Sequence, residues 1–210
     1  MVVFKDRIEA GVKLSQELRE YRNSDAIVLA VPRGGVAVGY TVATELNLPL
    51  GVVMIKKICH PSKPNSAIGS VSPYGKIINH SADVSQEYID AETHRIRQDL
   101  KERHRFYLKG REPFDVADRT VILVDDGIET GSTLNAAVEM IKHNQPSEII
   151  LAAPVAPYHM TESFKNLVDD VLVYHVPQVF FSVKRYYEDF REISDEEAIG
   201  MLRRANSIEV

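Results

Sequence analysis

The stretch VILVDDGIETGSTLNAA, residues 121–137, constrains the fold of this chain more than any other feature. Four aliphatic residues precede two adjacent aspartates, which are followed by a loop rich in Gly, Thr and Ser and then by a run with helical character. In doubly wound sheets, ligands bind outside the carboxyl ends of the strands, where backbone amides and a helix N-terminus can meet an anion. The stretch therefore predicts a buried strand, two carboxylates at its end, and an anion-binding loop that opens a helix.

Four further aliphatic runs have the length and composition of parallel strands that are buried on both faces of a sheet. These runs occupy residues 26–31, 50–55, 148–155 and 171–176. Helical patterns occupy residues 6–21, 36–46, 88–109, 132–143 and 160–167. Because strands that alternate with helices imply right-handed crossovers, we predict an α/β fold in which helices flank a central parallel sheet.

Some of these segments carry more specific expectations. The first helix should bury one apolar face, made of Ile8, Val12, Leu14 and Leu18. Residues 56–70, KKICHPSKPNSAIGS, are basic and contain prolines, so we expect a long, mobile and functional loop. Residues 88–109 carry only a thin apolar stripe, so most of that helix should be solvated; the stripe consists of Ile89, Ile96, Leu100 and Tyr107. Ser194 and Glu197 predict a capping box that starts a last helix.

Composition limits the classes of protein to consider. A chain of 210 residues suits one domain, and no apolar run approaches the ~20 residues that a membrane span requires. The net charge of −5 makes nucleic acid an unlikely partner. One cysteine, Cys59, fits a reducing compartment, and the first residues lack the pattern of a secretion signal. We therefore expect a cytoplasmic protein with no membrane partner.

The chemistry of the central loop favours a phosphorylated ligand. Gly131 allows the backbone to approach a ligand closely, and hydroxyl donors that suit a phosphate monoester come from Thr130, Ser132 and Thr133. The fingerprints of nucleoside triphosphate and dinucleotide sites are both missing from the sequence. Asp125 and Asp126 could hold Mg²⁺, or they could accept hydrogen bonds from the vicinal hydroxyls of a ribose.

The residues VDDGIETGST, 124–133, resemble the signature of the type I phosphoribosyltransferases. The resemblance implies that Asp125 and Asp126 hold the 2- and 3-hydroxyls of 5-phosphoribosyl 1-diphosphate (PRPP), and that residues 129–133 cradle its 5-phosphate. The implied PRPP-binding residues are Asp125, Asp126, Gly127, Ile128, Glu129, Thr130, Gly131, Ser132 and Thr133.

A second stretch, VPRGGVAVG at residues 31–39, resembles the pyrophosphate loop of the same family. Arg33 would supply a fixed cation to the diphosphate. Residues 56–70 fall where these enzymes carry a flexible loop that closes over PRPP and excludes water. The implied diphosphate-binding residues are Arg33, Gly34, Gly35, Lys56 and Lys57.

Glu129 departs from the pattern, because many family members have Thr, Ser or Ala at this place. Hypoxanthine-guanine phosphoribosyltransferases carry an acid there, positioned against the purine ring. Three interpretations stay open for Glu129: an acid/base group acting on the acceptor, a carboxylate that flanks the phosphate and repels it, or a solvated surface residue.

The resemblance covers nearly the whole chain and implies a single domain, residues 1–210, with a core at about 1–178 and a small C-terminal hood at about 179–210. Four aromatic residues of the tail could stack on an acceptor base or form the core of the hood: Phe180, Phe181, Tyr186 and Tyr187.

The implied activity is transfer of the 5-phosphoribosyl group from PRPP to a nitrogen acceptor with release of diphosphate, a step of nucleotide metabolism. A nucleobase is the favoured acceptor, with a slight preference for a purine. The implied catalytic residues are Glu129, Arg33 and Lys56; Mg²⁺ would bind through PRPP, with Asp125 and Asp126 as candidate ligands. A homodimer is a candidate assembly. The alternatives are a PRPP-sensing regulator without turnover, and a phosphoribosyl hydrolase or phosphatase-like enzyme.

Overall fold

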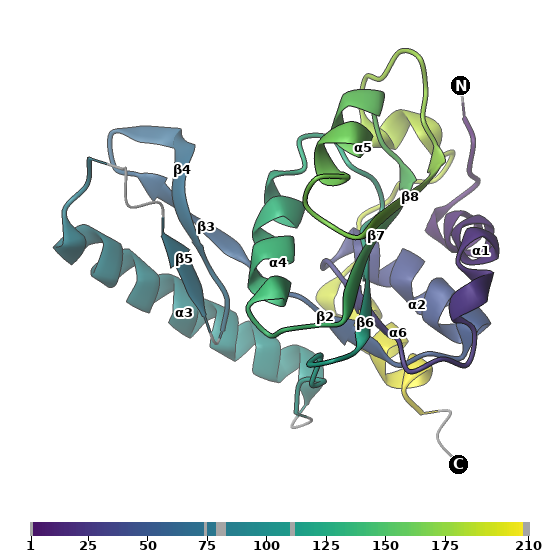
Figure 1. Ribbon diagram of the computed structural model, residues 1–210, viewed down its shortest axis with the longest axis horizontal. Coiled ribbons are helices and arrows are strands. Elements are labelled where there is room, and N and C mark those ends of the chain that lie inside the picture. The colour runs from purple at the N-terminus through teal and green to yellow at the C-terminus, as the bar shows by residue number, and fades with distance from the viewer. Residues whose placement is uncertain (1, 74, 79–82, 110–111, 208–210) are drawn as a thin grey trace.

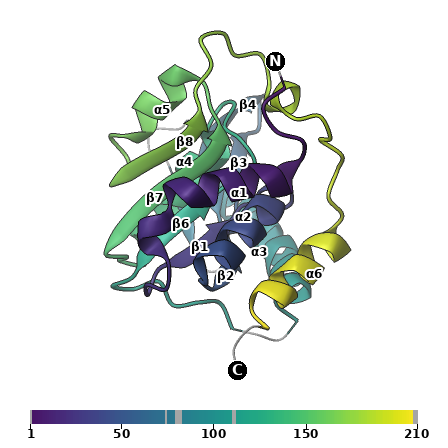
Figure 2. The same cartoon turned by 90° about the vertical axis from the view of Figure 1, so that its right-hand side faces the viewer.

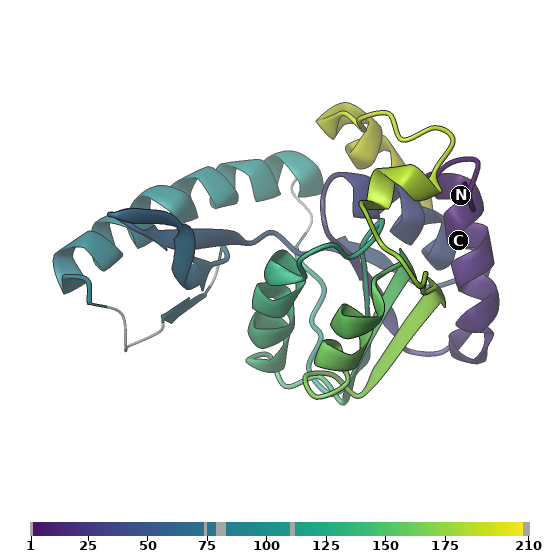
Figure 3. The same ribbon diagram turned by 90° about the horizontal axis from the view of Figure 1, so that it is seen from above.

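The structure, a computed structural model, describes residues 2–73, 75–78, 83–109 and 112–207. Its centre is a five-stranded sheet, and a separate three-stranded sheet extends away from it together with the longest helix (Figure 1). The view from above shows this extension most clearly (Figure 3). We call the extension the arm.

All pairings in the central sheet are parallel, in the order β2-β1-β6-β7-β8. The strands are β1 (Ile27–Ala30), β2 (Leu50–Val52), β6 (Thr120–Val124), β7 (Glu148–Val155) and β8 (Asp170–His175). This arrangement confirms the predicted α/β class with a central parallel sheet. The chain moves outward from β1 to β2 and later enters β6 on the other side of β1, so the sheet has a topological switch point between β1 and β6.

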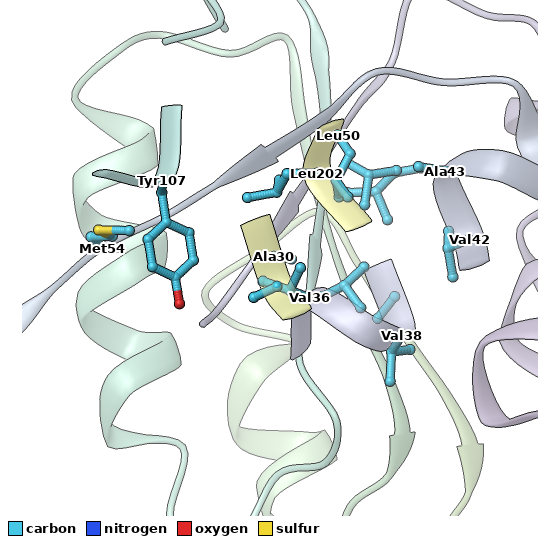
Figure 4. Close-up of a cluster of buried hydrophobic side chains, with 14 of the residues drawn as sticks. Ala30, Val36, Val38, Val42, Ala43, Leu50, Met54, Tyr107 and Leu202 are labelled. Atoms are coloured by element: carbon cyan, nitrogen blue, oxygen red, sulfur yellow. The ribbon is translucent and has the colours of Figure 1, made fainter. Parts of the chain in front are cut away.

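Helices cover both faces of this sheet (Figure 2). They are α1 (Arg7–Glu17), α2 (Gly34–Leu46) and α6 (Asp195–Ala205) on one side, and α4 (Ser132–Lys142) and α5 (Tyr158–Phe164) on the other. Alternate strand residues face the two layers: Val28 and Ile122 belong to the first core, whereas Ile27 and Val121 belong to the second. In the first core, Leu50 of the sheet, Val36 of α2 and Leu202 of α6 gather in one cluster (Figure 4).

The buried face of α1 differs from the prediction. Ile8 and Val12 are 42% and 36% exposed, so their assignment to the buried face was wrong, whereas Leu14 and Leu18 are fully buried as expected. The line that faces the interior is Arg7, Gly11, Leu14 and Leu18. The reason is close packing of the two helices: a Cβ at Gly11 would lie 2.6 Å from Cβ of Thr41 in α2.

The prediction of a loop at residues 56–70 was also wrong. The chain forms antiparallel strands there, β3 (Lys56–His60) and β4 (Lys63–Val71), and β5 (Lys76–Ile78) completes the sheet of the arm. This sheet packs on α3 (Gln86–Leu108), because Ile58 and Ile68 are buried in the same cluster as Ile89 and Ile96 of the helix. The stripe predicted for α3 is confirmed, since Ile89, Ile96, Leu100 and Tyr107 are its buried apolar residues.

The tail after β8 crosses the molecule and ends in α6. Among the described residues, two short 3-10 helices complete the elements, η1 (Arg19–Tyr21) and η2 (Val183–Tyr186). The capping box of Ser194 and Glu197 is confirmed, and α6 packs on α2 and α3. The division into a core and a hood stays a prediction, and residues 208–210 of that hood lie outside the described residues. Within the described part of the chain, no helix is long and apolar enough to cross a membrane.

Candidate functional site

The switch point brings together the two loops that the sequence singles out. Ala30 and Val124, the last residues of β1 and β6, are register partners, and the backbone N–H of Val31 donates to the carbonyl of Val124 (3.0 Å). The following loops leave the sheet side by side. A Cβ at Gly34 would lie 1.9 Å from Oδ2 of Asp126. Gly34 is therefore required by its close approach to the acid.

The two aspartates lie at the end of β6, against the N-terminus of α2. A Cβ at Gly35 would come within 2.9 Å of Oδ1 of Asp125, and the same oxygen accepts a hydrogen bond from the backbone N–H of Asp126 (2.9 Å). Burial raises the pKa of the Asp125 carboxyl well above its ordinary value, and the charge of Asp126 raises it further. Burial also raises the pKa of Asp126, although the charge of Arg7 and its hydrogen bond oppose that shift.

Arg7 is a site residue that the sequence analysis missed. Its Nε donates to Oδ2 of Asp126 (2.7 Å), its Nη1 donates to the carbonyl of Arg191 (2.8 Å), and its guanidinium lies 3.9 Å from the ring centre of Phe190. The Arg7 side chain is 9% exposed and that of Asp126 is 16% exposed, so the ion pair is largely buried. The sequence signal that could have identified Arg7 is its helical spacing from Gly11 and Leu14, which places the arginine on the buried face of its helix.

A pocket of about 360 Å³ opens at the acids and the loop that follows them. It collects every predicted PRPP-binding residue, together with Leu134 and the missed residues Arg7, Val183, Lys184 and Phe190. The loop ends at the N-terminus of α4, where the helix dipole favours an anion.

Gly131 shapes this loop. Its φ of 64° is in the left-handed region, and a Cβ there would lie 2.5 Å from Cε of Met160 and 2.8 Å from a ring carbon of Phe164. The hydroxyls of Thr130 and Ser132 lie 3.2 Å apart, within hydrogen-bonding distance of each other. The arrangement presents hydroxyl donors and a helix N-terminus to one small volume, which suits a phosphate group.

The tail closes one side of the pocket through contacts that no local sequence pattern predicts. Oε1 of Glu129 accepts a hydrogen bond from the backbone N–H of Val183 (2.8 Å), and the hydroxyl of Tyr187 donates to the carbonyl of Asp126 (2.6 Å). Lys184 follows Val183 and lines the pocket. Glu129 therefore anchors the tail, an arrangement that the three interpretations above did not include, and its acid/base role stays a prediction.

The four aromatic residues of the tail have different surroundings. Tyr186 and Tyr187 are buried, and the ring of Phe180 stacks on Tyr186 with the ring centres 5.7 Å apart. Phe181 is 66% exposed, and the guanidinium of Arg185 lies 4.6 Å from its ring centre. Phe181 is thus the most exposed aromatic residue of this set, and it is not among the residues that line the pocket at the acids.

The Arg33 loop borders a second pocket, of about 740 Å³. Its lining consists of Arg7, Pro32, Arg33, Gly34, Arg103, Glu192, Ile193 and Asp195. Arg7 lines both pockets, and Gly34 of the second lies against Asp126 of the first, so the two volumes are neighbours. Nη2 of Arg33 lies 3.7 Å from Oε2 of Glu192. We call the two volumes the acid pocket and the arginine pocket.

Lys56 and Lys57 are not brought to this centre. Lys56 lies in the arm, with its Nζ 3.9 Å from Oδ2 of Asp99 in α3, and among the described residues neither lysine lines the acid pocket or the arginine pocket. Their predicted contact with diphosphate would require movement of the arm, and it stays a prediction.

The fold is that of an α/β protein in which two loops meet at the switch point of a parallel sheet, the place where doubly wound sheets bind phosphorylated ligands. The family model described as "Phosphoribosyl transferase domain" matches residues 5–190. The chain therefore belongs to the phosphoribosyl transferase family, and the resemblance drawn from the sequence is confirmed.

Two relatives are similar to this chain over most of its length. "Putative phosphoribosyl transferase Rv0571c" of Mycobacterium tuberculosis is 31% identical over 211 residues, which cover 98% of this chain and 48% of that protein. The chain thus spans about half the length of the curated relatives it matches. The crystal structure of TT1426 from Thermus thermophilus has a TM-score of 0.88 and 33% identity, covering 97% of this chain and 99% of that one.

Proposed function

We propose that the protein transfers the 5-phosphoribosyl group from PRPP to a nitrogen acceptor. The bond between ribose C1 and the diphosphate oxygen breaks, a bond from C1 to the acceptor nitrogen forms, diphosphate leaves, and the acceptor nitrogen loses a proton. The observation that carries the proposal is the adjacency of the acid pocket and the arginine pocket at Arg7. A ribose 5-phosphate in the first pocket would direct a C1 diphosphate toward the second.

Each group of residues has a task in this proposal. Asp125 and Asp126 accept hydrogen bonds from the ribose hydroxyls, and residues 129–133 with the N-terminus of α4 hold the 5-phosphate. Arg33 stabilises the charge that develops on the leaving diphosphate. Lys56 would add to this only when the arm moves toward the site.

Mg²⁺ fits the proposal as a companion of the substrate. The donor set around Asp126 includes the guanidinium of Arg7, which already binds Oδ2 and would repel a cation placed there. Direct coordination by Asp125 and Asp126 is therefore disfavoured, and a cation held mainly by substrate phosphates suits the usual chemistry of Mg²⁺. Bound in that way, it would neutralise charge on the leaving group.

The acceptor is proposed to be a nucleobase. Phe181 offers an exposed ring for stacking, and Glu129 lies in the same pocket as the phosphate loop. A purine is favoured slightly, as the acid at position 129 suggests. A cytoplasmic location and a homodimer belong to the proposal as well.

The test is a screen for PRPP-dependent release of diphosphate with Mg²⁺, against bases and small amines, beside a reaction without acceptor. Acceptor-dependent release that disappears in Asp125→Asn supports the proposal. Equal release without acceptor would identify a hydrolase, and PRPP binding with no release under any condition would identify a sensor.

A further inference from the structure

Arg103 reaches the arginine pocket from α3, far in sequence from the loop that contains Arg33. Its Nη2 lies 2.9 Å from Oδ1 of Asp195, the first residue of α6, and the hydroxyl of Tyr107 donates to the same oxygen (2.5 Å). The Arg103 side chain is 45% exposed and belongs to the lining of the pocket. No motif in the sequence assigns a role to this arginine.

The arginines of the pocket are paired with carboxylates whose place an anionic ligand could take. Arg7, Arg33 and Arg103 line it together with the carboxylates of Glu192 and Asp195. Arg7 is committed to Asp126, whereas the pairs of Arg33 with Glu192 and of Arg103 with Asp195 are partly exposed. Exposed ion pairs contribute little stability, so a ligand with several negative charges can replace these carboxylates.

The state of Asp195 agrees with this arrangement. Partial burial acts to raise its pKa, but the hydrogen bonds from Tyr107 and Arg103, and the charges of Arg103 and Arg33, hold the pKa below its ordinary value. Both arginines therefore act on the same carboxylate. An anion in place of that carboxylate would be within the influence of both cations.

We propose that Arg103 is a further ligand of the diphosphate group, and that Asp195 is its counterion when the pocket is empty. Diphosphate would take over the guanidinium of Arg103 as it binds to Arg33. This inference rests on the proposed function, because it concerns the leaving group of the same reaction. It adds α3, the helix that supports the arm, to the elements that hold the substrate.

The competing explanation is that Arg103 only tethers α6 to α3. Two substitutions separate the explanations, Arg103→Gln and Asp195→Asn, because each breaks the same ion pair. If Arg103 binds diphosphate, Arg103→Gln weakens binding of inorganic diphosphate by about tenfold to a hundredfold. Asp195→Asn would strengthen the same binding several-fold, because it removes a competing negative charge. A tether predicts losses of stability in both variants and no change of opposite sign.

Calorimetric titration with inorganic diphosphate and, separately, with ribose 5-phosphate provides the measurement, with melting temperatures for both variants. Arg105→Gln on the same helix is the matched control, since Arg105 is exposed and lines neither pocket as described. Ribose 5-phosphate affinity should stay within about twofold in all three variants, because its proposed contacts lie in the acid pocket. Equal diphosphate affinity in Arg103→Gln and Arg105→Gln, with both ligands bound by the unaltered protein, would overturn this inference alone. Failure of the unaltered protein to bind either ligand would instead overturn the proposed function.

Discussion

Replacing Arg7 with Met tests the most constrained contact of the site. The change removes the cation that binds Asp126 and leaves a carboxylate with 16% exposure without its partner. Breaking a buried ion pair from one side costs about 3–5 kcal/mol, and the partial exposure of Asp126 places the expected loss near the lower limit, at about 3 kcal/mol. For a chain of this length, that loss lowers the melting temperature by roughly 6–12 °C.

The assay is urea unfolding at pH 7.5 and at lower pH, with Arg7→Met, Asp126→Asn and the double variant. Arg22→Met, an exposed arginine beyond the same helix, is the control. The double variant should be more stable than the sum of the single losses predicts, by about 0.5–3 kcal/mol, because the two side chains interact directly.

The dependence on pH has a definite sign. Burial already raises the pKa of Asp126, and without Arg7 the folded-state pKa rises further because the opposing charge is gone. A neutral carboxyl needs no cation, so the loss of stability in Arg7→Met is fully present above the pKa of Asp126 in the folded variant. The loss shrinks as the pH falls through that pKa. Additive single losses, or a loss below about 1 kcal/mol that does not change with pH, would refute this account of the ion pair.

Three further predictions concern the other parts of the site. Burial raises the pKa of Asp125, so its ionised form destabilises the folded state at neutral pH, and Asp125→Asn should raise the melting temperature by a few degrees. The same variant should lose the increase in melting temperature that ribose 5-phosphate causes, and an increase that is retained would contradict the ribose assignment. Glu129→Gln keeps an oxygen that can accept the hydrogen bond from Val183, so it should leave the affinity for PRPP unchanged. If Glu129 is the acid/base group, the rate of transfer falls by ~10²-fold, whereas turnover equal to that of the unaltered enzyme would leave anchoring of the tail as its role. Amide hydrogen exchange in β3 and β4 should slow when PRPP binds if Lys56 moves to the site. Exchange rates that are the same with and without PRPP would mean that the arm is static.

Features encoded within a few consecutive residues could be predicted from the sequence. Residues 121–137 specify strand, acids, loop and helix in order, because a buried parallel strand, a loop with glycine at a left-handed position and a helix N-terminus each have a short pattern. The capping box at Ser194 could be predicted for the same reason. The arm could not, because prolines and lysines in residues 56–70 suggested a loop, while the burial of Ile58 and Ile68 depends on α3.

The sequence by itself therefore determined the parallel sheet, the position of the acids and the loop that opens α4, since each follows from local propensity and apolar patterning. The tertiary structure alone decided which distant groups meet them. Arg7 reaches Asp126 across 119 residues, and Glu129 reaches Val183 across 54, through strand order and the path of the tail. Such contacts depend on how packed elements are oriented, as the close approach of α1 to α2 at Gly11 shows, and a charged residue on a helix carries no local sign of the partner that packing will give it.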